Sequence, residues 1–197
     1  MKTLAIEREF GSGGREIGMK VAEAAGIPYY DSNLLVEAAK RYGISIGKLQ
    51  DYDEKGSGSI MYNLFLAANY MQGVDMSEVY EIQYQVKETI KLLELEGPAV
   101  FIGRCATEIL KYHENVVRVY IYSSSDRKRI NRIMETEGVS EEEARQLMEK
   151  KDRSRRNYFR SFTQKDWRDR KNYDLELNTD MISADDCADL LLHMLQQ

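Results

Sequence analysis

The sequence contains few of the residues that build disulfide scaffolds or metal centres. Its 197 residues include only two cysteines, Cys105 and Cys187, and two histidines, His113 and His193. Cysteines so far apart predict two reduced, buried thiols, as is usual in a reducing compartment. Histidines so few and so separated do not predict a metal cluster. A chain of this length can bury a hydrophobic core without cross-links, so we expect a single domain over residues 1–197.

Long hydrophobic runs and an overall excess of positive charge are also absent. The chain reaches Glu7 and Arg8 after a short apolar run, so we expect neither a signal peptide nor a membrane span, and a cytoplasmic location. The net charge of −5 argues against a general nucleic-acid-binding protein. Residues 150–171 nevertheless hold ten lysines and arginines against three aspartates. This basic cluster favours an anionic small-molecule ligand, although a solvated charged helix would also explain it.

Short apolar runs alternate with helical patterns along the chain. Strands are predicted at residues 3–6, 27–30, 99–102, 116–122 and 174–177. This alternation predicts an α/β fold in which a parallel sheet is covered on both faces and binds ligands at the carboxyl ends of its strands. Residues 42–97 lack a convincing strand and are predicted to form a helical insertion. Its tyrosines would face a substrate or a partner, or belong to a helix that packs on its own core.

A glycine-rich segment stands between the first predicted strand and the first predicted helix. Gly11, Gly13 and Gly14 let the backbone turn tightly and approach an anion, while the start of the helix favours negative charge. A tight strand-to-helix turn requires glycine in any case, so the position after the first strand carries the prediction. We expect the segment to bind the phosphates of a nucleotide through Gly11, Ser12, Gly13, Gly14, Arg15 and Glu16.

The segment departs from the phosphate-loop pattern G-x-x-x-x-G-K-[ST]. With Gly13 as the second glycine, Arg8 stands at the first-glycine position and Gly14 at the lysine position. A transferring phosphate needs a cation near its oxygens, and Arg15, one position later, is the candidate for this catalytic role. A surface arginine paired with an acid such as Glu16 is the alternative. The spacing also differs from the G-x-G-x-x-G of dinucleotide-binding proteins.

Polar residues follow the second and third predicted strands. Asp31 and Ser32 follow the second strand, where they would bind the substrate, cap a helix, or do both. Arg104 follows Gly103 at the end of the third strand, where its guanidinium would bind the acceptor's phosphate or the transferring group and take part in catalysis. Both positions suit phosphoryl transfer, which depends on positioning and on positive charge around the phosphate oxygens.

Within the basic cluster, Arg153, Arg156 and Arg160 share one helix face. We expect Arg153 and Arg156 to act in catalysis and Arg160 to bind the nucleotide. Like charges at this density repel one another without an anion, so the cluster is interpreted as an arginine-rich lid over residues 150–171 that closes on the nucleotide.

Together these motifs resemble the cytidylate kinase-like family of P-loop nucleoside monophosphate kinases. The resemblance covers nearly the whole chain and is carried by residues 6–18, 30–32, 100–104, 151–156 and 173–179. It implies a P-loop NTPase fold, with a five-stranded parallel sheet in the order 2-3-1-4-5, that binds ATP with Mg²⁺ and passes the γ-phosphate to an acceptor. It does not identify the magnesium ligands. True cytidylate kinases carry a lysine where Gly14 stands and an aspartate where Cys105 stands, so the resemblance does not name CMP as the acceptor.

We therefore interpret the chain as an ATP-dependent phosphotransferase, similar to nucleoside monophosphate kinases, that acts on a nucleotide or another small metabolite and has no nucleic-acid or membrane partner. One alternative is a nucleotide-binding regulatory module without catalysis, which the absent lysine favours. Another is an interaction protein in which the tyrosine-rich insertion binds another chain, for example a second copy in a homodimer.

Overall fold

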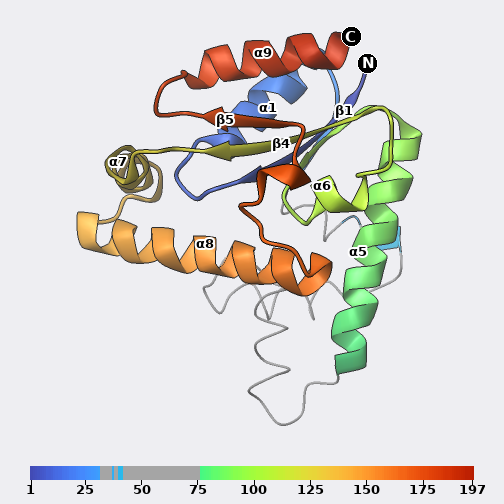
Figure 1. Cartoon of the computed structure of the whole chain (residues 1–197), viewed down its shortest axis with the longest axis horizontal. Helices are drawn as coiled ribbons and strands as arrows, with labels where there is room; N and C mark the ends of the chain where they lie inside the picture. The colour runs from blue at the N-terminus through green and yellow to red at the C-terminus, as the bar shows by residue number, and fades with distance from the viewer. Residues whose placement is uncertain (32–36, 38–39, 42–75) are drawn as a thin grey trace.

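A five-stranded parallel sheet forms the centre of the computed structural model, which describes residues 1–31, 37, 40–41 and 76–197 (Figure 1). The strands are β1 (Thr3–Arg8), β2 (Tyr29–Tyr30), β3 (Val100–Ile102), β4 (Val116–Tyr122) and β5 (Leu175–Asn178). Their order is β2-β3-β1-β4-β5, which confirms the order that the resemblance implies. In the register, Ile6 of β1 lies beside Ile102 of β3 and Val119 of β4.

Helices cover both faces of the sheet, as predicted. One face carries α1 (Gly14–Ala25) and α9 (Ala184–Gln196), and the other carries α5 (Met76–Glu96), α6 (Ala106–Ile109) and α8 (Glu141–Thr163) (Figure 1). Alternate residues of β1 point to opposite faces, so Leu4 and Ile6 pack with α1 and α9, whereas Ala5 packs with α5, α6 and α8. Burial on both faces explains why Thr3 through Glu7 are all buried.

Two helices in succession follow β4 and reach the sheet edge where the cavity opens. Helix α7 (Asp126–Glu137) ends at Gly138, and α8 begins after Ser140, whose side chain and that of Glu143 form a reciprocal capping box. Residues 164–174, including the 3₁₀ turn Arg170–Asn172, return the chain to β5. In this return segment Trp167 is fully buried, and its carbonyl accepts a hydrogen bond of 2.6 Å from the Tyr173 hydroxyl.

The predicted arginine-rich lid coincides with the second half of α8 and the return segment. Helix α8 buries Asp152, Tyr158 and Phe159 against the rest of the domain. The structure shows this segment in one arrangement, so its closure over a nucleotide stays a prediction.

Much of the predicted helical insertion lies outside the described residues. The structure describes its last part as α5, on which Tyr84 is exposed, while Tyr62 and Tyr70 belong to the undescribed part. Cys105 and Cys187 are buried free thiols, as predicted. No helix in the described ranges combines the length and apolar character needed to cross a membrane.

Candidate active site

A cavity of about 550 Å³ opens at the carboxyl ends of β1 and β3. Its walls come from the end of β1, the glycine-rich segment, the start of α1, the turn after β3, and the inner faces of α7 and α8. The volume lies within the range of small-molecule sites, roughly 300–1,000 Å³. The cavity also lies where ligands of open parallel sheets bind.

The glycine-rich segment forms a tight turn whose backbone faces this cavity. Gly11 and Gly13 have φ angles of 76° and 81°, in the left-handed region that side chains disfavour. Gly13 is the residue before α1 and offers no side chain to cap it. The Gly14 N–H donates to the Ser12 Oγ (3.4 Å), so the next N–H groups of the first helical turn are those that an anion could reach. Ser12 is turned inward instead, since its Oγ donates to the carbonyl of Glu9 (2.9 Å) and it does not line the cavity.

Buried charges hold the entry of the segment in place. The Arg129 side chain is only 4% exposed, and its guanidinium binds the carboxylates of Glu9 (3.2 Å) and Asp152 and the carbonyl of Phe10 (2.8 Å). Asp152 also accepts the backbone N–H of Phe10 (2.7 Å), and Arg168 donates to Glu9 (2.7 Å). Residues 9–10 are therefore fixed from α7, α8 and the return segment at once.

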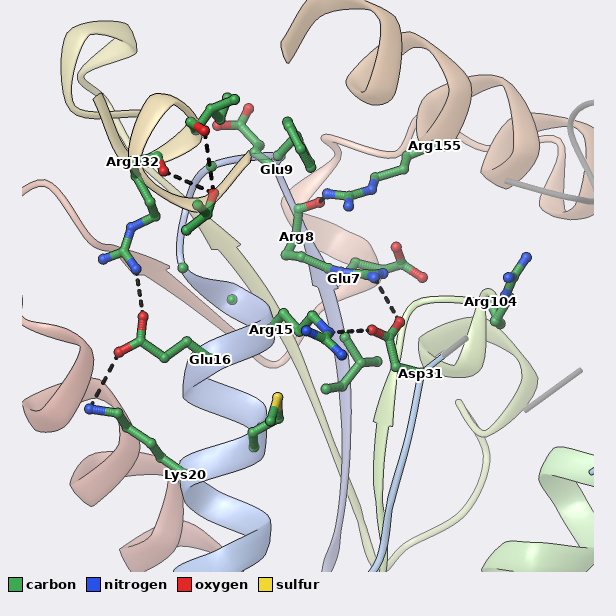
Figure 2. Close-up of a pocket in the computed structure, with 18 of the residues that line it drawn as sticks. Glu7, Arg8, Glu9, Arg15, Glu16, Lys20, Asp31, Arg104, Arg132 and Arg155 are labelled. Atoms are coloured by element: carbon green, nitrogen blue, oxygen red, sulfur yellow. Dashed lines mark hydrogen bonds and ion pairs between the residues drawn. The ribbon is translucent and has the colours of Figure 1, made fainter. Parts of the chain in front are cut away.

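More exposed ion pairs stand at the exit of the segment, around the rim of the cavity (Figure 2). The Arg15 Nε donates to Asp31 Oδ2 (2.8 Å), and the Arg15 side chain is 61% exposed. Glu16 accepts from Arg132 (2.6 Å) and pairs with Lys20 (3.3 Å). Arg15 and Arg132 are each paired with one carboxylate, which an incoming anion could replace, whereas Lys20 also pairs with Asp185.

Three arginines that the sequence analysis did not select line the cavity: Arg132 at the rim, and Arg8 and Arg155 deeper inside. Arg8 crosses its floor and donates to Asp31 Oδ1 (3.1 Å), as Figure 2 shows. Arg155 projects from α8, and its Nη1 donates to the carbonyl of Arg8 (2.9 Å). Burial, and then the neighbouring charge of Arg8, lower the pKa of Arg155 to about 9. A bound anion would relieve the cost of keeping this guanidinium charged.

Arg104 lines the same cavity from a turn with an unusual backbone. Gly103, Arg104 and Cys105 have φ angles of 78°, 57° and 57° in succession, which side chains rarely adopt. The turn is held because the Cys105 N–H donates to the buried carboxylate of Glu7 (3.2 Å). Among the described residues, Arg104 has no hydrogen-bond or ion-pair partner, so its guanidinium is available to a ligand. Strain of this kind is frequent at functional sites.

The deeper wall of the cavity contains ionisable groups with shifted pKa values. Burial raises the pKa of Glu7, whose carboxylate also accepts from the Trp167 indole N–H (3.1 Å). Burial likewise raises the pKa of the Cys105 thiol well above its usual value, so this thiol is not the thiolate that covalent catalysis requires. The pKa of Tyr158 is raised by burial too, and its buried hydroxyl has no hydrogen-bond partner in the described part of the chain.

The cavity brings most of the predicted site residues together: Gly11, Gly13, Gly14, Arg15, Glu16, Asp31 and Arg104 line it. Ser32 lies outside the described residues. Arg153, Arg156 and Arg160 do not line the cavity but lie on the exposed face of α8, so their contacts with a nucleotide stay predictions.

The amphipathic pattern of α8 explains why its inward arginine is Arg155. Met148, Asp152 and Phe159 are buried, and the successive spacings of four, three and four residues along Met148, Asp152, Arg155 and Phe159 place all four on one helix face. This periodicity was the signal in the sequence that could have identified Arg155 as the inward arginine. It was obscured because one of the buried positions is occupied by a charged residue, Asp152.

The described residues offer no evident magnesium site of their own. They contain no group of three or more acidic, histidine or cysteine side chains that could hold a metal ion. In the phosphate-loop pattern a serine or threonine hydroxyl contacts Mg²⁺, and here Arg15 stands at that position. The donor set at the cavity therefore does not match the protein ligands of a P-loop magnesium ion.

Solved structures with the same fold include kinases. The chain is similar to an uncharacterized protein from Eubacterium ventriosum, with a TM-score of 0.73, 25% identity, and coverage of 100% of this chain and 99% of that one. It is also similar to the shikimate kinase from Bacteroides thetaiotaomicron (TM-score 0.54, 12% identity, coverage 100% and 99%). A third is the shikimate kinase from Acinetobacter baumannii in complex with shikimate (TM-score 0.50, 15% identity, coverage 100% and 93%). At these identities the two shikimate kinases show the fold alone.

Sequence comparison assigns the family. None of the curated proteins matches the chain. The model of the cytidylate kinase-like family matches residues 3–181, which include β1, the glycine-rich segment, the turn after β3 and all of α8. This chain belongs to the cytidylate kinase-like family.

Proposed function

We propose that the protein is an ATP-dependent phosphotransferase that acts on a nucleotide or another small metabolite. The observation that carries the proposal is the convergence of a glycine-rich helix start and five arginines on one cavity: Arg8, Arg15, Arg104, Arg132 and Arg155. Phosphoryl transfer depends mainly on positioning and on positive charge around the phosphate oxygens, and this arrangement supplies both. Membership of a kinase-like family supports phosphotransfer in general.

The geometry suggests how the two substrates would share the cavity. The glycine-rich segment and the start of α1 would bind the nucleotide's phosphates through backbone N–H groups. Asp31, Arg104 and the unpartnered hydroxyl of Tyr158 would bind the acceptor on the side of β3 and α8. Because the buried Cys105 remains a thiol, we propose direct transfer to the acceptor rather than transfer through this cysteine.

Magnesium enters this proposal as the ion that accompanies ATP. Mg²⁺ commonly keeps several waters and binds through substrate phosphates together with one or two carboxylates. Since Arg15 stands where a hydroxyl ligand is usual and Asp31 is bound to two arginines, we assign no protein ligand and no step to the metal.

Nucleotide binding and turnover are tested separately. At a nucleotide concentration one hundred times its Kd, ATP should raise the free energy of unfolding by about 2.7 kcal/mol, measured as a shift in Tm. ATP consumption should then be followed with a panel of nucleoside monophosphates and small hydroxylated metabolites, including shikimate because of the two structural neighbours. The absence of any Tm shift at millimolar nucleotide would contradict the proposal.

A regulatory module that binds nucleotide without catalysis is the second candidate. One observation favours it: a Cβ at position 14 would lie 2.6 Å from the Cβ of Arg8, so the loop has no space for the usual lysine. A protein that ATP stabilises but that consumes no ATP with any acceptor of the panel would fit this candidate instead.

A further inference from the structure

We propose that Arg8, at the end of β1, supplies the cation that other phosphate loops take from a lysine on the following helix. This inference rests on the proposed function and deepens it. In the pattern G-x-x-x-x-G-K-[ST], Arg8 occupies the first-glycine position and Gly14 the lysine position. The long cationic side chain and the glycine have exchanged places within the same loop.

Contacts between the two positions show that the exchange is reciprocal. A Cβ built on Gly14 would lie 2.6 Å from the Cβ of Arg8, closer than real Cβ atoms approach, and 3.1 Å from its Cγ, which is also a tight contact. The stem of Arg8 therefore passes beside the point from which a lysine side chain would leave the helix. Only one of the two positions can carry a long side chain, and in this chain it is position 8.

A second glycine makes room for the other end of the side chain. A Cβ on Gly103 would lie 2.0 Å from Nη1 of Arg8, so a side chain at position 103 would displace the guanidinium from this place. Beyond Gly103, Nη2 of Arg8 donates to Asp31 (3.1 Å). The Arg8 side chain thus extends from the start of α1 to the turn that carries Arg104. It spans the cavity between the proposed nucleotide side and the proposed acceptor side.

In the part of the chain that the structure describes, the Arg8 guanidinium keeps one unsatisfied donor beside its ion pair with Asp31. Its side chain is 13% exposed, and within the described ranges its Nε is buried without a hydrogen-bond acceptor. A buried donor without an acceptor is costly, and a phosphate oxygen in the cavity would satisfy it. Arg155 adds a second cation, since it binds the Arg8 carbonyl, and the repulsion between the two guanidiniums would be relieved by the same anion.

Arg15 is less suited to this role, although the sequence pattern favours it. Its side chain is 61% exposed and binds the other oxygen of Asp31 from outside the cavity floor. In the proposed reaction the acceptor oxygen bonds to the γ-phosphorus, the bond to the β,γ-bridging oxygen breaks, and the electron pair leaves with ADP, while a hydroxyl acceptor gives its proton to water. Arg8 would neutralise the charge that grows on the departing β-phosphate.

An exchange experiment tests the inference. Arg8→Ala and Arg8→Gln should lower kcat/KM about a hundredfold or more, the effect of removing one preorganised charge-stabilising donor. Both should also reduce the ratio of ATP affinity to AMP affinity, measured by calorimetry. Arg8→Gln keeps the stem and a donor for Asp31, so it serves if Arg8→Ala does not fold. Arg127→Ala, which removes an arginine from an exposed ion pair with Glu141 (3.0 Å), is the matched control and should change neither quantity.

The reciprocal variant gives the sharpest result. Gly14→Lys alone should lose stability and activity because its stem meets Arg8. The double variant Arg8→Gly with Gly14→Lys restores the usual loop and should recover both relative to either single change. A double variant no better than the singles, or an Arg8→Gln protein with kcat/KM and affinity ratio within about twofold of wild type, would overturn the inference and leave the proposed function standing. A wild-type protein that neither binds nor consumes ATP would overturn both.

Discussion

The two ends of the glycine-rich segment are held by opposite kinds of ion pair. Glu9 and Phe10, at the entry, are fixed by Arg129 and Asp152, whose side chains are 4% and 6% exposed. At the exit, Arg15 and Glu16 form pairs at the rim, with side chains that are 61% and 44% exposed. At the entry, the buried ion pairs are costly to desolvate, but they fix the backbone. At the exit, the exposed ion pairs are weak, so their cations remain available to a ligand. A binding loop needs both, a fixed backbone and releasable cations.

The largest expected effect is at the entry. Asp152→Ala should lower the free energy of unfolding by about 3–5 kcal/mol, because it removes one of the two buried carboxylates that bind Arg129 and leaves the Phe10 N–H without its acceptor. Urea unfolding followed by circular dichroism measures this.

Asp126→Ala is the matched control for this change. Asp126 contacts the same Arg129 at 3.6 Å, but its side chain is 72% exposed, so the loss should stay below about 1 kcal/mol. Equal losses for the two variants would remove the distinction between buried and exposed partners.

Arg104→Lys tests a releasable cation that has no protein partner in the described residues. Lysine keeps the charge but loses the planar fork, so kcat/KM should fall about tenfold or more while Tm changes little. The measurement is steady-state ATP consumption with the acceptor found in the panel. Unchanged kinetics would remove Arg104 from the site.

The pH dependence of stability tests the burial of Glu7 in the cavity wall. Burial raises its pKa in the folded protein above the ordinary 4.5, so ionised Glu7 disfavours folding. Relative to Glu7→Gln, wild-type stability should therefore increase as pH falls from neutral through the raised pKa, and level off below about 4.5. Acids elsewhere whose pKa values are lowered, such as Asp174, contribute equally to both proteins and cancel. A difference that is constant with pH would contradict the assignment.

The smallest expected effect is at the exit. Arg15→Ala should change the free energy of unfolding by less than about 0.5 kcal/mol, because a single exposed pair with Asp31 is lost. It also tests the role that the loop pattern gives to Arg15. If Arg15 replaces the lysine, the transition state should lose about 2–4 kcal/mol, and if Arg8 does, the loss in kcat/KM should be well below that of Arg8→Ala.

Local patterns predicted the elements of this protein better than the contacts of its site. The strands, the helix after the glycine-rich segment and the positions of Asp31 and Arg104 follow from periodicity and from the rule that parallel strands end at one edge. The role of Arg8 could not be predicted in this way. Its path depends on two glycines, one of them ninety-five positions away in the sequence, and no local pattern records such a tertiary approach.

Helix α8 shows the second reason for a missed contact. The sequence analysis grouped Arg153, Arg156 and Arg160 by their mutual spacing. The inward face of the helix is instead defined by the residues that are buried against the rest of the protein. That face includes Asp152, which is buried because Arg129 pairs with it. A buried ion pair therefore allows a charged residue to occupy an inward position of the helix. A hydrophobic pattern would assign the same residue to the solvent-facing side.

The single tryptophan of the chain gives the protein an optical reporter at the cavity wall. The Trp167 indole is fully buried, stands edge-on to the Tyr120 ring at 5.3 Å, and donates to the Glu7 carboxylate that lines the cavity. Indole emission responds to nearby charge and polarity, so a phosphate arriving beside Arg8, or a proton arriving on Glu7, should alter the fluorescence of the unlabelled protein. Because no other tryptophan contributes, the emission of the native chain can be read as a signal from this one site.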